Sequence, residues 1–280
     1  MPKTKIISVV NQKGGVGKTT TAVNLSTAMA ACGLSVLLVD FDPQGNASTG
    51  LGIEQKNRNA NSYRLVTGQC TAQDAVKNCI VPQLDILPAT MDLSAAEIEL
   101  SDLERREFRL ADGLAALDGQ YDYILIDCPP SLGLLTVNAL AASHTVLVPL
   151  QCEFYALEGL AQLMTTIAAV RTNLNPSLAM QGIVLTMYDT RNKLSEMVEA
   201  DVRGHFGATV YDTVIPRNVR ISEAPSFGKP VLMYDLKCAG AQAYAALAAE
   251  LLKQEKQAVL QRNPPQNLNH PPQKQPHPLG

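Results

Sequence analysis

Apolar residues along this chain follow two alternating spacings. Short runs rich in Val, Ile and Leu are apolar on both faces, which is typical of parallel strands covered by helices on both sides. Segments with helical spacing lie between these runs. The alternation predicts an α/β fold, a doubly wound and mostly parallel sheet with helices on both faces. The predicted strands are residues 5–10, 35–39, 84–88, 123–126, 145–149, 182–187 and 210–215.

The helical spacing also predicts where helices begin. Ser94 and Glu97 have the spacing of a capping box and favour a helix start just before them. Residues 45–61, rich in Gly, Asn and Ser, are expected to form an active-site loop and a connecting segment. The predicted helices are residues 19–32, 93–117, 132–141, 157–172, 194–206 and 239–256.

Length and composition predict one large domain and a tail. The 280 residues are 46% hydrophobic and 18% charged, which is enough for a substantial core. We expect a single domain over residues 1–257. Residues 258–280 are dominated by Pro, Gln, Asn and His, cannot bury enough apolar surface to order themselves, and are expected to be disordered.

A glycine-rich segment follows the first predicted strand and precedes a predicted helix, which is the context of a phosphate-binding loop. Backbone N–H groups of such a loop surround phosphates, and the helix N-terminus adds partial positive charge. Lys18 is expected to reach the β- and γ-phosphates, and Thr19 to hold Mg²⁺. The segment consists of Lys13, Gly14, Gly15, Val16, Gly17, Lys18, Thr19 and Thr20.

The segment departs from the common phosphate-loop pattern at its start. Gln12 stands where that pattern has glycine, and Lys13 adds a second lysine. Lys13 could be an ordinary solvated surface charge. Alternatively, if its backbone turns it away from its own nucleotide, it can serve a nucleotide on a facing subunit.

Three aspartates follow predicted strands at the same edge of the sheet. Asp40 and Asp42, spaced i and i+2, face the same way on an extended strand and could fix Mg²⁺ through water and orient an attacking water. The competing interpretation is that Asp42 begins an ordinary turn. Asp127 ends a buried strand, where hydrated Mg²⁺ would balance its charge. Helix capping is the competitor for Asp127, and the following Pro129 argues against it.

Residues 13–20, 39–46 and 126–131 together resemble the deviant Walker ATPases, and most closely the ParA/Soj partitioning proteins. The resemblance extends over about residues 5–252. It implies a P-loop ATPase domain that uses ATP and Mg²⁺. It also implies that Asp42 positions the hydrolytic water and that Asp40 supports the magnesium shell.

The nucleotide base is expected to be adenine. Asn192-Lys193-Leu194-Ser195 lacks the aspartate with which GTP-binding proteins usually read guanine. The resemblance places the segment around Pro216 and Asn218 beside the adenine. Pro216 could equally be an ordinary strand terminator.

Charge gives little support for nucleic-acid binding by itself. The net charge is −3 and the pI about 5.8, so any DNA contact must come from a local patch. Basic residues between positions 189 and 229 are matched in number by acidic ones, which describes a mixed solvated surface. The resemblance nevertheless implies that Arg191 and Arg220 contact DNA phosphates.

The combined expectation is a partitioning ATPase. Two ATP-bound protomers would form a sandwich homodimer that binds DNA non-specifically and is released by hydrolysis. A ParB/Spo0J-like centromere-binding partner would stimulate that hydrolysis. With no signal peptide and no apolar stretch long enough to cross a bilayer, the protein is expected in the cytoplasm, at the nucleoid and without a membrane partner.

Three rival functions compete with partitioning. A MinD-like membrane-associated regulator of cell division needs a basic amphipathic C-terminal helix, whereas residues 244–249 are mostly small. An iron–sulfur carrier would need Cys128 and Cys152, and the six cysteines form no C-x-x-C pair. An ATP-dependent amidoligase would need a second substrate pocket, which no motif identifies.

Overall fold

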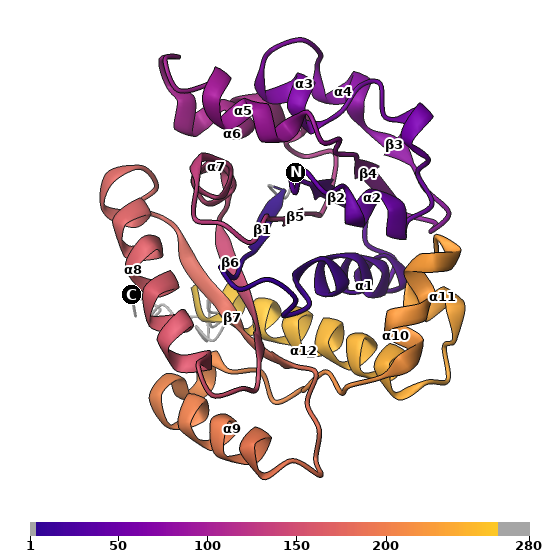
Figure 1. The fold of residues 1–280 in the computed structure, drawn as a ribbon, viewed down its shortest axis with the longest axis vertical. Coiled ribbons are helices and arrows are strands. Elements are labelled where there is room, and N and C mark those ends of the chain that lie inside the picture. Colours follow the sequence, from indigo (N-terminus) through magenta and orange to yellow (C-terminus); the bar gives the residue numbers. More distant parts are fainter. Residues whose placement is uncertain (1–3, 263–280) are drawn as a thin grey trace, which may run out of the picture.

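The computed structural model describes residues 4–262. It shows a seven-stranded sheet in the order β3-β4-β2-β5-β1-β6-β7 (Figure 1). Strand β3 is antiparallel to β4, and every other pair of neighbours is parallel. The predicted α/β, doubly wound and mostly parallel sheet is therefore confirmed. The strands are β1 Lys5–Val9, β2 Val36–Asp40, β3 Lys77–Asn78, β4 Leu84–Leu87, β5 Tyr123–Asp127, β6 Thr145–Gln151 and β7 Ala179–Thr186.

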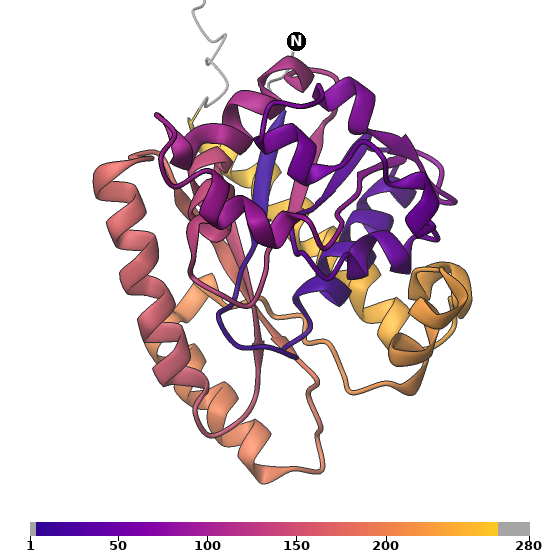
Figure 2. The same ribbon diagram turned by 45° about the horizontal axis from the view of Figure 1, so that its top comes forward.

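Helices cover both faces of this sheet (Figures 1 and 2). The α-helices are α1 Lys18–Ala31, α2 Asn46–Gly50, α3 Ser62–Val66, α4 Ala72–Ala75, α5 Leu93–Glu99, α6 Arg109–Leu114, α7 Leu134–Ala142, α8 Ala156–Asn173, α9 Lys193–Phe206, α10 Val219–Glu223, α11 Val231–Tyr234 and α12 Ala239–Arg262. The 3₁₀ helices are η1 Gln55–Asn57, η2 Arg106–Phe108, η3 Ala115–Leu117, η4 Gly207–Thr209 and η5 Ala224–Phe227.

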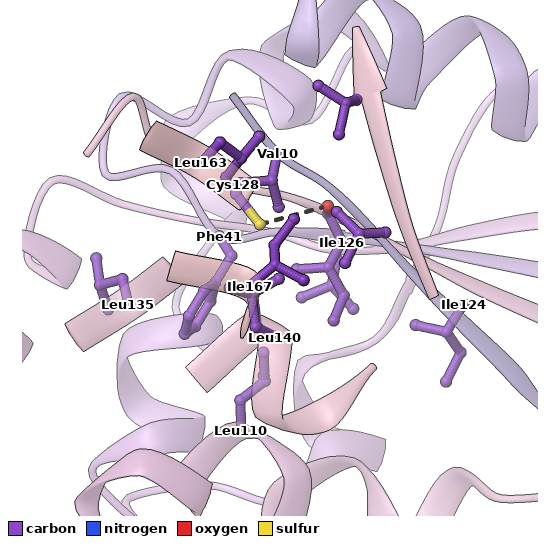
Figure 3. Close-up of a cluster of buried hydrophobic side chains, with 14 of the residues drawn as sticks. Val10, Phe41, Leu110, Ile124, Ile126, Cys128, Leu135, Leu140, Leu163 and Ile167 are labelled. Atoms are coloured by element: carbon purple, nitrogen blue, oxygen red, sulfur yellow. Dashed lines mark hydrogen bonds between the residues drawn. The ribbon is translucent and has the colours of Figure 1, made fainter. Parts of the chain in front are cut away.

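Two hydrophobic cores lie on the two faces of the sheet. Alternate side chains of each strand point to opposite faces, so Leu37 and Val39 of β2 join one core while Val36 and Leu38 join the other. Helices α3 to α9 supply the first core, part of which Figure 3 shows. Helices α1, α2, α11 and α12 supply the second. Both faces are covered by buried apolar side chains, as the apolar strand pattern predicted.

The predicted strand at residues 210–215 is wrong. An isolated bridge joins Val210 to Ile183 of β7, and the N–H groups of Tyr211 and Ile215 donate to β7 carbonyls at 2.9 and 2.8 Å, but these contacts do not form a continuous ladder. Between them, the backbone N–H groups of Asp212 and Thr213 donate to the Glu250 carboxylate at 2.8 and 2.9 Å. A side chain of α12 therefore takes the backbone donors in the middle of the segment and interrupts the ladder there.

The predicted helix at residues 93–117 is broken into four short pieces. Helix α5 ends at Glu99, and Arg105 adopts a left-handed backbone with φ 56° that no helix can continue through. The expected capping box is absent. The Ser94 hydroxyl donates instead to the carbonyl of Met91 at 2.8 Å, and Asp92 at the N-cap forms no side-chain cap.

Helix α12 continues to Arg262, beyond the domain boundary expected at residue 257. The remainder of the predicted tail, residues 263–280, lies outside the described residues. Within residues 4–262, no helix is both long and apolar enough to span a bilayer.

The strand order brings the three predicted motifs to one edge of the sheet. Strand β5 lies between β1 and β2, so Asp127 at its end is in register with Val9 on one side and Asp40 on the other. The loops after all three strands leave the sheet at their carboxyl ends. In parallel α/β sheets this edge is where ligands bind.

Candidate functional site

The loop between β1 and α1 is held open by its glycines and anchored from β6 and β7. Gly15 and Gly17 have φ of 77° and 90°, a region that favours glycine. The Thr186 hydroxyl, at the end of β7, donates to the carbonyl of Val16 at 2.8 Å. Asn11 donates to the carbonyl of Pro149 at 2.8 Å and accepts from the loop backbone. The loop is therefore fixed before any ligand arrives.

Lys18 is buried at the first position of α1. Its ammonium donates to the carbonyl of Lys13 at 2.9 Å, so its side chain folds back across its own loop. Burial lowers the pKa of Lys18, because the charged form loses hydration, while the charge of Asp127 opposes that shift. A phosphate at this point would supply the counter-charge that the ammonium lacks.

Lys13 has different surroundings from Lys18. Its side chain is 45% exposed and forms an ion pair with Glu153, just after β6. The ammonium is thus directed to the outside of the loop. This is the placement expected of a group that serves a facing subunit, and an ordinary surface lysine would look the same.

Asp127 is the most unusual polar group of the site. It is fully buried, and neither carboxylate oxygen accepts a hydrogen bond of normal geometry within residues 4–262. Burial raises its pKa well above the ordinary value, as does the negative charge of Asp40, although the nearby Thr19 hydroxyl opposes the rise. A buried carboxylate with two orphaned oxygens fits a hydrated Mg²⁺.

The metal would find few protein ligands here. Among residues 4–262, no three His, Cys, Asp or Glu side chains gather as a metal cage. This suits Mg²⁺, which usually takes one or two protein oxygens together with substrate phosphates and water. Thr19 and Asp127 would hold it.

Asp40 is also fully buried, but its hydrogen bonds are largely satisfied. Oδ2 accepts from the backbone N–H and the hydroxyl of Ser48 at 2.7 and 2.6 Å. Burial raises the pKa of Asp40 to about 6, against these hydrogen bonds. The carboxylate thereby docks α2 onto β2, which is compatible with an indirect part in a magnesium shell.

Asp42 begins a tight turn and also faces the site. Its carbonyl accepts from the N–H of Gly45 at 2.9 Å, and Oδ1 accepts from the N–H of Gln44 at 2.9 Å. The turn interpretation of the sequence is therefore correct for the backbone. None of the hydrogen bonds found among residues 4–262 ends on Oδ2, so this oxygen is free to orient a water.

Pro216 and Asn218 line a cavity of about 340 Å³ that reaches the phosphate loop. Gly17 and Thr20 form its wall on the side of α1, and Tyr244 of α12 contributes as well. Asn218 also caps α10, since its Oδ1 accepts from the N–H of Arg220 at 2.9 Å. The cavity lies where a base would be if the phosphates occupied the loop.

Arg191 and Arg220 lie outside this cluster and are paired with acids. Arg191 forms a two-point contact with Asp189 at 3.0 and 2.9 Å. Arg220 pairs with Glu223 at 2.9 Å and with Asp235 at 3.5 Å. Both guanidinium groups are exposed enough to exchange these partners for phosphates.

Sequence reasoning missed three contacts that hold the candidate site residues in place. Ser48 holds Asp40, Glu153 holds Lys13, and Thr186 holds the loop. Only the position of Ser48, near the start of the glycine-rich stretch after Asp42, offered any local signal.

The two cysteines considered for a cluster are buried in apolar surroundings. Cys128 packs among Phe41, Leu163 and Ile167, and its thiol donates to the carbonyl of Ile126 at 3.7 Å (Figure 3). Burial raises the pKa of Cys128, and that of Cys152 to about 12. Both are therefore thiols of the hydrophobic core.

Comparison with known proteins agrees with this geometry. The AAA domain family matches residues 4–180. The chromosome partitioning protein ParA of Caulobacter vibrioides is 61% identical over 254 residues, covering 90% of this chain and 95% of the relative. The sporulation initiation inhibitor protein Soj of Bacillus subtilis is 53% identical, covering 88% and 98%.

A solved structure with similar architecture carries a nucleotide. The cobyrinic acid a,c-diamide synthase of Mycobacterium smegmatis with bound ADP and magnesium has a TM-score of 0.81 and 38% identity. The match covers 91% of this chain and 96% of that one. With its two-lysine loop and three strand-end aspartates, the chain belongs to the ParA/Soj family of chromosome-partitioning ATPases.

Proposed function

We propose that this ATPase uses ATP and Mg²⁺ to form a sandwich homodimer that binds DNA non-specifically. A ParB/Spo0J-like centromere-binding partner then stimulates hydrolysis, and hydrolysis releases the protein from the nucleoid. The observation that carries the proposal is the contrast between the two lysines: Lys18 is buried in its own loop, whereas Lys13 points outward from it.

The proposed hydrolytic site divides its work among few groups. Mg²⁺, when bound, would neutralise charge on the β- and γ-phosphates. Thr19 and Asp127 would hold the metal, Lys18 would bind the phosphates, and Asp42 would orient the attacking water through its free oxygen. Lys13 of the facing protomer supplies positive charge where negative charge develops. Closure of the dimer therefore completes the site.

DNA binding would follow from the same closure. Arg191 and Arg220 are exposed on segments next to the base cavity, and a dimer would present two of each. Phosphates would replace Asp189 and Glu223 as their partners. Each protomer alone offers too few cations for firm binding, since affinity grows with the number of phosphates contacted.

The oligomeric step can be tested with the Asp42→Ala protein. Without the water-positioning carboxylate it should accumulate as a dimer with ATP and remain a monomer with ADP, as seen by light scattering. Wild-type protein under the same conditions should show only a transient dimer. Hydrolysis by Asp42→Ala at the wild-type rate would refute the role given to Asp42.

A further inference from the structure

Arg58 is a buried arginine without an acidic partner. Its exposure is 2%, and it forms no ion pair with any carboxylate among residues 4–262. Burial lowers its pKa, with only the more distant charge of Asp40 opposing. Fully buried arginines are rare unless they are paired, because the charge loses its hydration. An unpaired one needs another explanation.

The guanidinium of Arg58 is satisfied by uncharged oxygens instead. These acceptors lie in two places: the segment that follows β2, residues 45–53, and the residue Ala89 just after β4. Nη1 donates to the carbonyls of Gly45 and Ala89, both at 3.2 Å, Nη2 to the Thr49 hydroxyl at 2.9 Å and to the carbonyl of Ile53 at 2.6 Å, and Nε to the same carbonyl at 3.0 Å.

The contact with Gly45 reaches the proposed catalytic turn. Gly45 closes that turn, because its N–H donates to the carbonyl of Asp42. A Cβ on Gly45 would lie 2.5 Å from Nη1 of Arg58 and 3.1 Å from the carbonyl of Ala89. Glycine at this position thus lets the guanidinium lie directly against the turn, and the left-handed φ of 63° favours glycine as well.

A second path ties the same frame to Asp40. The Ser48 hydroxyl donates to Asp40 and accepts from the N–H of Ala89 at 3.1 Å. Ala89 is therefore held from one side by Ser48 and from the other by Arg58. These contacts join the Asp40 carboxylate and the backbone turn that carries Asp42 into one frame, and among the described residues that form it Arg58 is the only positive charge.

We propose that Arg58 is a positioning residue for hydrolysis, which it serves by fixing the backbone turn that aims Asp42. This rests on the proposed role of Asp42 in orienting water. Arg58 lines neither the base cavity nor the phosphate loop, so its contribution belongs to the chemical step and not to nucleotide affinity. A displacement of about 1 Å in a catalytic group can reduce turnover about 100-fold.

The test replaces Arg58 with lysine, which keeps the charge and loses the planar fork. For Arg58→Lys we expect kcat for ATP hydrolysis to fall about 10- to 100-fold, with KM within about 3-fold of the wild-type value. Thr49→Val is the milder second variant. It removes the hydroxyl between Nη2 and the carbonyl of Gly45 and should lower kcat in the same direction.

Arg109→Lys is the matched control. The Arg109 guanidinium also donates to a backbone carbonyl, that of Val66 at 2.8 Å, but it lies on α6 away from the turn. This variant should keep wild-type kcat whatever its thermal stability. Melting temperatures of all variants show whether a loss of activity merely follows a loss of fold.

Two results would overturn the inference. One is a folded Arg58→Lys protein with wild-type kcat, and the other is a loss of kcat that tracks melting temperature equally in Arg58→Lys and Arg109→Lys. Asp42→Ala in the same series separates the two claims. If it is inactive while Arg58→Lys is normal, only the role of Arg58 fails; if it keeps wild-type turnover, the role of Asp42 fails and that of Arg58 with it.

Discussion

The two lysines of the phosphate loop show how identical side chains acquire different functions from their surroundings. Lys18 is 6% exposed and lies over its own loop, so a phosphate bound there would replace a carbonyl as its partner. Lys13 is held by a single carboxylate at the surface. The first lysine should govern affinity and the second assembly.

Substitution of each lysine by alanine should separate these effects. Lys18→Ala should lose ATP binding or the productive phosphate geometry, because no other buried cation of the loop reaches the phosphates. Lys13→Ala should retain ATP affinity but fail to dimerise. Binding of a fluorescent ATP analogue measures the first effect and light scattering the second. An ATP-dependent dimer of Lys13→Ala would contradict the proposed action across the interface.

Without metal, the buried charge of Asp127 should destabilise the folded protein relative to a variant with a neutral side chain at this position. Its pKa is raised above the ordinary value of 3.8, so the folded state retains a proton that the unfolded state has released. Stability contributed at this residue therefore falls as pH rises above about 4. Near neutral pH, the free energy of unfolding of Asp127→Asn should exceed that of the wild type by about 1–3 kcal/mol. Urea denaturation in the presence of a chelator measures this difference.

The advantage of Asp127→Asn should shrink as the pH is lowered through about 4, because the aspartate of the unfolded state then takes up a proton as well. Asp201→Asn, at an exposed position of α9, is the control and should show no such trend. A difference between Asp127→Asn and wild type that is independent of pH would contradict the buried-charge interpretation.

At the scale of elements, the sequence predicts regular pieces better than short or bent ones. The parallel strands were predictable because burial on both faces leaves a continuous apolar run, as in residues 36–39. The segment at 210–215 is rich in β-branched and aromatic residues as well, but its ladder is interrupted by Glu250, which lies on α12 and far along the chain. A side chain that competes for backbone N–H groups from a distant part of the chain leaves no signal in the local sequence.

In the candidate site, too, residues that follow regular strands were predictable and the residues that support them were not. The phosphate loop and the three aspartates were predictable, because each follows a strand and parallel strands end at one edge. The groups that hold them were not. Arg58 and Ser48 become partners of the turn that carries Asp42 only when the segment after β2 folds against the end of β4, and in the sequence around Arg58 nothing distinguishes it from a surface residue.

Helix α2 is short and depends on Ser48 for its attachment to β2. Ser48→Ala removes the hydroxyl bond to Asp40 and leaves the N–H of Ala89 without an acceptor. We expect a loss of about 2–3 kcal/mol in unfolding free energy and slower hydrolysis, with nucleotide binding retained. Urea denaturation and steady-state ATPase assays measure both effects.

Ser94→Ala is the matched control for this substitution, because the Ser94 hydroxyl also donates a hydrogen bond, to the carbonyl of Met91, but at an exposed helix start. It should change stability by less than about 0.5 kcal/mol. Equal effects of the two serine variants would show that α2 does not depend on its contact with Asp40.

At the scale of the whole molecule, the acidic balance of the chain restricts how DNA can be bound. With a net charge of −3, general attraction is absent, and the proposal places binding on a few arginines that gather only in the dimer. Closure would then set affinity by doubling the number of phosphate contacts. The fold offers a link between nucleotide binding and DNA binding, since the cavity beside the phosphate loop and the pocket around Arg191 share Pro216 and Arg217.

Charge reversal at the arginines should separate dimerisation from DNA binding. Arg191→Glu and Arg220→Glu should dimerise with ATP as the wild type does and lose affinity for duplex DNA, because neither residue touches the phosphate loop. Lys56→Glu, at an exposed position next to Glu54, is the control and should bind DNA normally. Wild-type DNA affinity in both arginine variants would place the contact surface elsewhere.

The most direct test of nucleotide-gated DNA binding is the salt dependence of affinity for non-specific duplex DNA, measured on Asp42→Ala with ATP and with ADP. If each protomer contacts about three phosphates, the slope of log affinity against log salt should change from about −3 with ADP to about −6 with ATP. Equal slopes in the two states, or no binding by a dimer verified by light scattering, would contradict the account.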